Sequence, residues 1–182
     1  MEKYFLNKEE AILVIIDVQE RLVPVMSERE NVIKNINVLI SMAKSMEIPI
    51  VVTQQYSKGL GDTVPQINEN LEGAMKFEKN TFSGCIEEVM DHIDKTGRKK
   101  IIISGMETHV CVLQSVRDLI DQGYYVFVAS DAVCSRTKVN YKNGLSMMQD
   151  MGAVISNTET ILFDLLKKSG TLQFKALSKL IK

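Results

Sequence analysis

Short, nearly uninterrupted runs of apolar residues recur along the chain and predict buried β-strands. Such runs are typical of strands that are covered on both faces in a parallel sheet. The first of them, AILVIID, ends in the carboxylate of Asp17. The predicted strands are residues 11–17, 48–53, 100–104, 124–130 and a short fifth strand at 153–156.

Amphipathic segments separate these runs. Val32, Ile36, Leu39 and Ala43 recur at helical spacing, which predicts a helix over residues 29–47. Further helices are predicted at residues 83–95, after Cys111, at 138–151, from 157 or 158 to 168, and at 172–181. This alternation predicts an α/β fold: a doubly wound, Rossmann-like, mainly parallel sheet of five to six strands with helices on both faces, in three α/β/α layers.

Residues 54–80 break the alternation. They show no sustained period and contain Gly59, Gly61, Pro65 and Gly73, so they are predicted to form a long connection between the second strand and the next helix. Connections of this length inside a compact domain are usually functional. Because the chain shows neither an internal repeat nor a domain linker, residues 1–182 are predicted to form a single domain.

The composition narrows the class of protein. Of the 182 residues, 45% are hydrophobic and 25% charged, and the formal net charge is -1. This balance excludes disorder and a nucleic-acid binder that relies on a basic surface. Apolar runs fall well short of the ~20 residues of a membrane span, and the first ten residues are polar and charged. We therefore expect a soluble, cytoplasmic protein without membrane or nucleic-acid partners.

Cysteine and histidine are scarce. Cys85, Cys111 and Cys134 lie far apart in sequence, which argues against a disulfide framework and against a zinc-thiolate cluster. His92 and His109 are the two histidines, too few for a histidine-rich metal site. The sequence thus predicts free thiols and no metal, so any chemistry must use other groups.

In open parallel sheets, ligands bind at the carboxyl ends of the strands. Asp17 leaves the first predicted strand, and Cys111 follows the third, near the start of a helix. Free backbone N–H groups and the helix dipole favour a thiolate at such a position. Packing as a small hydrophobic residue is the interpretation for Cys85 and Cys134. For Cys111, position alone leaves both interpretations open.

A nucleophilic thiol needs a base. His109 is two residues from Cys111, and side chains at that spacing in a helical turn do not face each other. Asp17 is the better candidate if its strand neighbours the third one, but it would need an apolar site and a nearby cation. The long connection offers three lysines, Lys58, Lys76 and Lys79. Spacing gives little reason to prefer Lys79 over Lys76.

Five sequence blocks resemble the isochorismatase-like cysteine hydrolases. They are IIDVQ at residues 15–19, TQQYSKGLG at 53–61, EKNTFS at 78–83, SGMETHVCV at 104–112 and SDAVCSR at 130–136. The resemblance runs from about residue 9 to the C-terminus and is strongest to the isochorismatase domain-containing proteins. Each block alone is weak, but their order and spacing are specific together.

The resemblance implies site residues and an activity. It makes Cys111 the nucleophile, Asp17 the general base and Lys79 the cation of a triad, with a cis peptide at Met106–Glu107 and an oxyanion hole formed by the backbone N–H groups of Glu107 and Cys111. It also implies a substrate pocket lined by Gln19, Gln55, Tyr56 and Thr108. The implied reaction is metal-independent cleavage of a C–N bond in a small amide or ureide through a thioester.

Departures from related families leave two alternatives. Nicotinamidases hold a metal with an aspartate and histidines after the second strand, whereas this chain has Gln54, Gln55 and Tyr56 there, so no metal or cofactor is expected. Isochorismatases proper hydrolyse a vinyl ether and lack the nucleophilic cysteine. The alternatives are such vinyl ether hydrolysis and a catalytically silent binding protein. Relatives commonly assemble, which implies a homo-oligomer that acts on a small molecule.

Overall fold

The computed structural model describes residues 1–181 and has a six-stranded sheet at its centre. All neighbouring strands are parallel, in the order β3-β2-β1-β4-β5-β6. The strands are β1 (Ala11–Ile16), β2 (Ile50–Gln55), β3 (Met75–Lys79), β4 (Lys100–Met106), β5 (Tyr125–Cys134) and β6 (Val154–Ser156). This sheet confirms the predicted α/β class.

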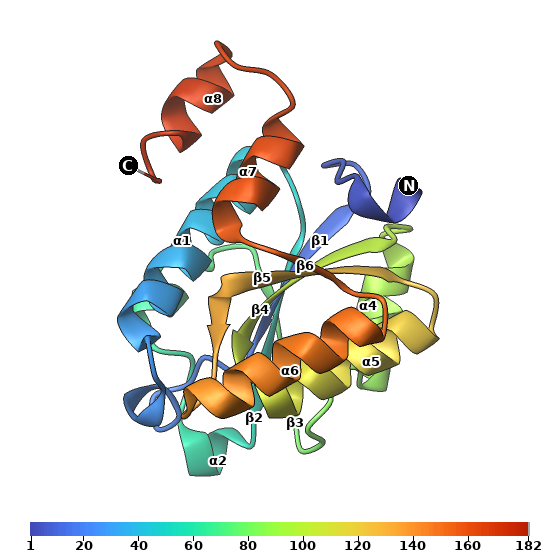
Figure 1. Ribbon diagram of the computed structural model, residues 1–182. Helices are drawn as coiled ribbons and strands as arrows, with labels where there is room; N and C mark the ends of the chain where they lie inside the picture. The colour runs from blue at the N-terminus through green and yellow to red at the C-terminus, as the bar shows by residue number, and fades with distance from the viewer. Residues whose placement is uncertain (182) are drawn as a thin grey trace.

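Helices cover both faces of the sheet and complete three layers (Figure 1). One face carries α1 (Arg29–Ser45), α7 (Thr158–Leu166) and α8 (Leu172–Leu177); the other carries α4 (Glu87–Lys95), α5 (Leu113–Asp121) and α6 (Lys138–Asp150). Two short helices, α2 (Ser57–Leu60) and α3 (Pro65–Asn68), lie between β2 and β3. Short 3-10 turns span Glu2–Tyr4 and Val23–Val25, and a π-helical turn spans Thr108–Val112.

The central strand β1 shows why its sequence is apolar throughout. All six of its residues are buried. Leu13 and Ile15 pack with α1 and α7, whereas Ile12, Val14 and Ile16 pack with α4 and α5 on the opposite face. Because successive strand side chains point to opposite faces, a strand covered on both sides has no place for a polar residue.

The strand order creates a division at the middle of the sheet. From β1 the chain moves outward through β2 to β3, and then returns to β4 before moving outward through β5 to β6. Connections on the two sides therefore diverge between the carboxyl ends of β1 and β4, where Ile16 pairs with Gly105. Ligands bind at such switch points in open α/β sheets. Asp17 is expected to serve as a base for Cys111 only if its strand neighbours the one before Cys111. The pairing of β1 with β4 meets this condition.

Two sequence predictions are corrected. Residues 54–80, predicted to be an irregular connection, contain α2, α3 and the edge strand β3, so Lys79 is the last residue of a strand. The helix predicted from Ser83 begins at Glu87 instead. Strand β3 escaped notice because its residues alternate apolar and charged, and most of them are not buried, since it has β2 as its single neighbour.

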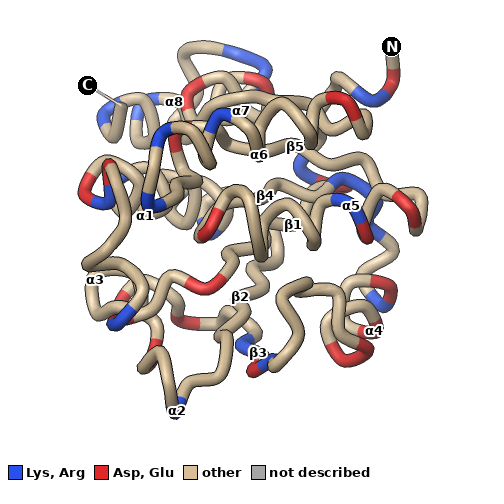
Figure 2. The backbone as a smooth tube through the Cα atoms, turned by 60° about the horizontal axis from the view of Figure 1, so that its bottom comes forward, with Lys and Arg blue, Asp and Glu red and all other residues tan. Residues whose placement is uncertain are grey.

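Charged residues of both signs are spread around the fold (Figure 2). Neither sign gathers along one whole side of the fold, although α4 carries four acidic residues, Glu87, Glu88, Asp91 and Asp94. Within residues 1–181, helices fall short of the length and apolar character needed to cross a membrane.

The close contact between β1 and β4 predicts a strong effect of Gly105→Ala. Gly105 has a φ of +119°, and a Cβ atom there would lie 2.0 Å from the Ile16 carbonyl oxygen. We expect the variant to lose at least about 3 kcal/mol of unfolding free energy, measured by urea denaturation. The matched control is Gly97→Ala, which has a φ of +68° but no atom within 4 Å of the new Cβ, and should lose about 1–2 kcal/mol. Equal losses would contradict the steric argument.

Candidate active site

Asp17 and Lys79 form a buried ion pair at the carboxyl edge of the sheet. Lys79 Nζ donates to Asp17 Oδ2 over 2.6 Å, and the two residues are 2% and 0% exposed. Thr53 Oγ1 donates to the other carboxylate oxygen over 2.7 Å. Asp17 follows β1 directly and has a φ of +51°, a left-handed conformation that aspartate tolerates better than most residues and that concentrates at functional sites.

The Lys79 ammonium group is surrounded by oxygen atoms. Besides Asp17, it contacts Gln55 Oε1 at 2.7 Å and the carbonyl oxygens of Thr81 and Phe82 at 3.1 and 3.2 Å. A lysine has three protons to donate, so these four acceptors exceed its capacity and two of them share a proton. Lys79 is therefore a buried cation whose hydrogen-bonding capacity is fully used by protein oxygen atoms, and these four contacts hold its ammonium group in place.

Of the three candidate lysines, the structure brings Lys79 into contact with Asp17. Lys76 donates to the side chain of Asn68, away from Asp17. Lys58 lies in α2, whose residues are not buried. The structure thus brings Lys79 to Asp17, a choice that spacing could not make because it depends on the pairing of β3 with β2.

Cys111 lies beside this pair, in the π-helical turn that joins β4 to α5, and is 7% exposed. Burial raises the pKa of the Cys111 thiol to about 12; the Asp17 charge and hydrogen bond and the Glu107 charge act in the same direction, while the charge of Lys79 opposes them. The sequence argument from the helix start favoured a thiolate. The structure changes that expectation, because burial and the carboxylates of Asp17 and Glu107 favour the neutral form of the thiol.

The other two cysteines lie in packed surroundings. Cys134 is 2% exposed within the core on the α1 face, and burial raises its pKa to about 12, with the Glu107 charge acting in the same direction. Cys85 is partly buried, donates to the Ser115 carbonyl oxygen over 3.5 Å, and has a pKa raised by burial to about 11. Both positions suit the packing interpretation.

The turn after β4 carries the backbone groups that the resemblance implies for an oxyanion hole. The Met106–Glu107 peptide is cis. The Glu107 carbonyl oxygen accepts from the N–H groups of Val110 and Val112 over 3.0 and 3.2 Å. The Glu107 carboxylate, which is 8% exposed, accepts from the backbone N–H and Nε of Arg136, both over 3.1 Å. Glu107 thus anchors the turn to the segment that follows β5.

The four residues expected to line a substrate pocket differ in their surroundings. Gln55 contacts Lys79 through Oε1 and donates to the Asn80 carbonyl oxygen over 3.0 Å. Tyr56 is 53% exposed at the rim. Thr108 is buried, and its Oγ1 has no hydrogen-bond partner among residues 1–181, so it retains its bonding capacity. These three remain candidates for substrate contact.

Gln19 has a different role from the one expected. It is 0% exposed, and its amide donates to the carbonyl oxygens of Gln55 and Gly61 and accepts from the Gln55 N–H over 2.7–3.0 Å. Its side chain is therefore committed to the backbone and joins the segment after β1 to those around β2 and α2. His109, the rejected base, has Nδ1 3.0 Å from Ser135 Oγ.

Sequence reasoning missed Thr53 and the carbonyl oxygens of the loop after Lys79. Thr53 could have been found, because it stands near the carboxyl end of β2 in register with Ile16 and therefore near Asp17. The carbonyl ligands of Lys79 give no side-chain signal. Within residues 1–181, no group of three or more His, Cys, Asp and Glu side chains is arranged to hold a metal ion.

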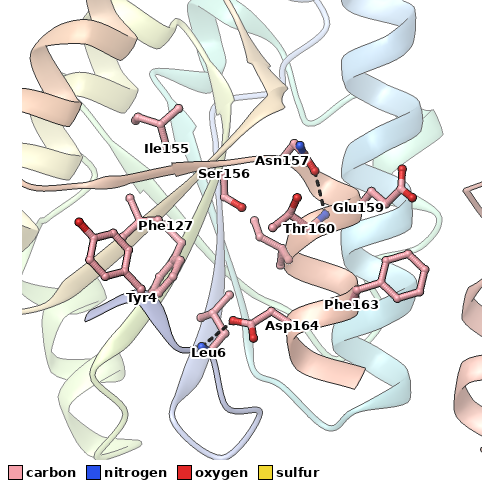
Figure 3. Close-up of a pocket in the computed structure, with 12 residues that line it drawn as sticks. Tyr4, Leu6, Phe127, Ile155, Ser156, Asn157, Glu159, Thr160, Phe163 and Asp164 are labelled. Atoms are coloured by element: carbon pink, nitrogen blue, oxygen red, sulfur yellow. Dashed lines mark hydrogen bonds between the residues drawn. The ribbon is translucent and has the colours of Figure 1, made fainter. Parts of the chain in front are cut away.

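A sizeable cavity lies away from these residues. It has a volume of about 680 Å³ between the N-terminal segment, β6 and α7 (Figure 3). Tyr4, Leu6 and Phe127 border it, and Asp164 there accepts a 2.8 Å hydrogen bond from the Leu6 N–H. Its lining contains hydroxyl groups and carboxylates but neither a cysteine nor a buried ion pair, so the arrangement of chemical groups, rather than volume, identifies the candidate site.

Comparisons with known proteins identify the relatives of this chain. A family model for the isochorismatase domain matches residues 11–160. The secreted isochorismatase effector Isc1 of Phytophthora sojae is 41% identical over 177 residues, covering 94% of this chain and 84% of the relative. Isochorismatase domain-containing protein 2 of Rattus norvegicus is 31% identical, covering 96% and 82%.

A solved structure described as the MAR1 ribonuclease of Caenorhabditis elegans superimposes with a TM-score of 0.93 at 35% identity, covering 97% of this chain and 92% of that one. The three-layer fold is thus shared along almost the whole length of both chains. With the family model matched over most of the sequence, the chain belongs to the isochorismatase family and has its hydrolase fold.

Proposed function

We propose that this protein is a metal-independent cysteine hydrolase that cleaves a C–N bond of a small amide or ureide through a thioester. Cys111 is the nucleophile, Asp17 the general base and Lys79 the cation. The observation that carries the proposal is the buried Asp17–Lys79 pair, 2.6 Å apart, next to a thiol whose pKa it influences. A base, a balancing charge and a nucleophile thus meet at the switch point of the sheet.

The raised pKa of Cys111 determines how the thiol reacts. Because burial raises the pKa well above 7, the thiol is mostly protonated at neutral pH, and a preformed thiolate contributes little. Asp17 must take the proton as the sulfur attacks the carbonyl carbon. Its negative charge is then neutralised, and the positive charge of Lys79 balances the oxyanion that forms in the same step.

The remaining steps follow from this first one. In the proposed scheme, the backbone N–H groups of Glu107 and Cys111 donate to the tetrahedral oxyanion, a contact worth about 2.7–4 kcal/mol for each donor. The C–N bond breaks, and protonated Asp17 returns its proton to the leaving amine. Water then attacks the thioester with Asp17 again as base, which releases a carboxylic acid and restores the Cys111 thiol.

Vinyl ether hydrolysis is the second candidate, because the family includes that chemistry. It would use Asp17 and Lys79 as acid-base and charge-balancing groups without a covalent bond to Cys111. The buried thiol beside Asp17 favours the covalent scheme, since a non-covalent one gives it no role. A silent binding protein has no need of a fully hydrogen-bonded buried cation at this edge.

Several broader expectations remain predictions. Residues 1–182 form one domain, the protein assembles as a homo-oligomer, and it acts on a small molecule in the cytoplasm. The Phytophthora sojae relative is described as secreted.

The first test is hydrolysis by active-site variants. We expect Cys111→Ala and Asp17→Asn to lower kcat/KM by at least about 10³-fold, because each removes a group that reacts in the covalent step. Ammonia release from a panel of small amides and ureides provides the measurement. Cys134→Ala, which removes a buried thiol outside the triad, is the matched control and should stay within about twofold. Wild-type rates in Cys111→Ala would refute the covalent scheme; pyruvate release from isochorismate by that variant would support the second candidate.

The pH dependence of Cys111 alkylation tests the state of the thiol. In a Cys85→Ala, Cys134→Ala background, the iodoacetamide rate should rise about tenfold per pH unit between pH 7 and 10, because the raised pKa keeps the thiolate scarce below pH 12. Mass spectrometry of the modified peptide gives the rate, and the same background carrying Cys111→Ala supplies the blank. A plateau below pH 9 would show that the thiol is already ionised there.

A further inference from the structure

Ser115 stands four residues after Cys111 in α5 and is 1% exposed. Its hydroxyl donates to the Cys111 carbonyl oxygen over 2.6 Å. The same hydroxyl oxygen accepts from the Gly84 N–H over 2.7 Å. One buried hydroxyl therefore joins the turn that carries the nucleophile to a segment 31 residues away in sequence.

That segment also holds the cation. Residues 80–86 connect β3 to α4, and the carbonyl oxygens of Thr81 and Phe82 contact Lys79 Nζ at 3.1 and 3.2 Å. Gly84 follows two residues later and bonds to Ser115. A second contact lies next to it, since Cys85 Sγ donates to the Ser115 carbonyl oxygen over 3.5 Å. The loop thus contacts the ammonium group at one end and the helix of the nucleophile at the other.

The approach of loop and helix is close at this point. A Cβ atom at Gly84 would lie 3.1 Å from Ser115 Oγ and 3.1 Å from Ile16 Cδ1, so glycine lets the backbone N–H reach the hydroxyl. Two further hydrogen bonds of the loop are local, from Thr81 Oγ1 to Ser83 O and from Cys85 N to Ser83 Oγ, and Gln55 Nε2 donates to the Asn80 carbonyl oxygen at its start. These local bonds shape the loop, whereas the Ser115 contacts attach it to α5.

We propose that Ser115 is a positioning residue whose hydroxyl couples the Cys111 turn to the loop that holds Lys79. The coupling keeps the nucleophile and the cation in one relative placement although they come from different connections of the sheet. This inference rests on the proposed roles of Cys111 and Lys79.

A simpler role for the hydroxyl is local. Serine in a helix often donates to the carbonyl oxygen four residues earlier, which bends the helix without further consequence. The bond accepted from Gly84 goes beyond that role, because it joins α5 to the loop between β3 and α4, which lies 31 residues away in sequence. The two roles differ in what happens to Lys79 when the hydroxyl is removed: the local role leaves the ammonium unchanged, and the coupling role loosens it.

The experiment measures hydrogen exchange of the Lys79 ammonium protons by ¹⁵N-resolved NMR in the full-length protein, with the signal assigned by its loss in Lys79→Arg. In Ser115→Ala we expect exchange at least tenfold faster than in wild type, because the carbonyl contacts of Thr81 and Phe82 are no longer held in place. Ser115→Thr retains a hydroxyl that can reach the same carbonyl oxygen and should stay within about twofold of wild type.

Ser130→Ala is the matched control, since Ser130 Oγ also donates to a carbonyl oxygen, that of Ser156, over 2.7 Å but on β5 and away from the triad. It should leave Lys79 exchange within about twofold. Gly84→Ala disturbs the same contact from the loop side and should accelerate exchange as Ser115→Ala does; it decides the matter if Ser115→Ala does not fold.

Turnover gives a second measurement on any amide that the wild type hydrolyses. Ser115→Ala should lower kcat about tenfold with KM within about twofold, and Ser115→Thr should restore it. Lys79 exchange within twofold of wild type in Ser115→Ala, or equal acceleration in Ser130→Ala, would overturn the inference. Failure of the proposed function is separate, because it would appear as full activity of Cys111→Ala whatever the Lys79 exchange rate.

Discussion

The buried ion pair between Asp17 and Lys79 is the interaction on which the site depends. Removing two charges from water costs several kcal/mol for each ion, and Coulomb attraction repays that cost when the geometry is good and the remaining polar atoms are bonded. Here the contact is 2.6 Å, Thr53 occupies the second carboxylate oxygen, and three further oxygens surround the ammonium group. The pair is thus stable because the whole cluster is satisfied.

The strand order brings this cluster together. Asp17 and Lys79 are 62 residues apart, at the ends of β1 and β3, with β2 between them. The parallel register places Thr53 beside Ile16 and Gln55 beside Lys79, so all three strands contribute to the cluster at the same edge. Cys111 arrives from the other side, through β4. The nucleophile and its ionic partners therefore belong to opposite halves of the sheet and meet where the halves diverge.

The sequence predicted the parts of the fold that depend on burial. The apolar runs of β1, β2 and β4 are strands because both faces are covered, and the amphipathic stripe of α1 packs on one of those faces. Strand β3 could not be predicted in this way. Its charged residues Lys76 and Glu78 are exposed at the sheet edge, and its strand geometry comes from pairing with β2, a contact between distant parts of the chain.

For the site residues too, the sequence was informative about position along the chain and uninformative about contacts between distant segments. Asp17 and Cys111 could be singled out because they follow strands, whereas the selection of Lys79 needed the pairing of β3, and the commitment of Gln19 to the backbone needed the loop geometry. The protonation state of Cys111 also escaped prediction. The position at a helix start was visible in the sequence, but the burial and the neighbouring carboxylates that outweigh it were not.

The edge position of β3 has a consequence for how the molecule loses its activity. Local opening of a protein begins where neighbours are few, and edge strands open at lower free energy than central ones. Lys79 ends a strand with a single neighbour, while Asp17 and Cys111 adjoin the two innermost strands. The cation is thus held by an edge strand, so a local opening of that edge would detach the charge-balancing member of the site while the central core stays folded.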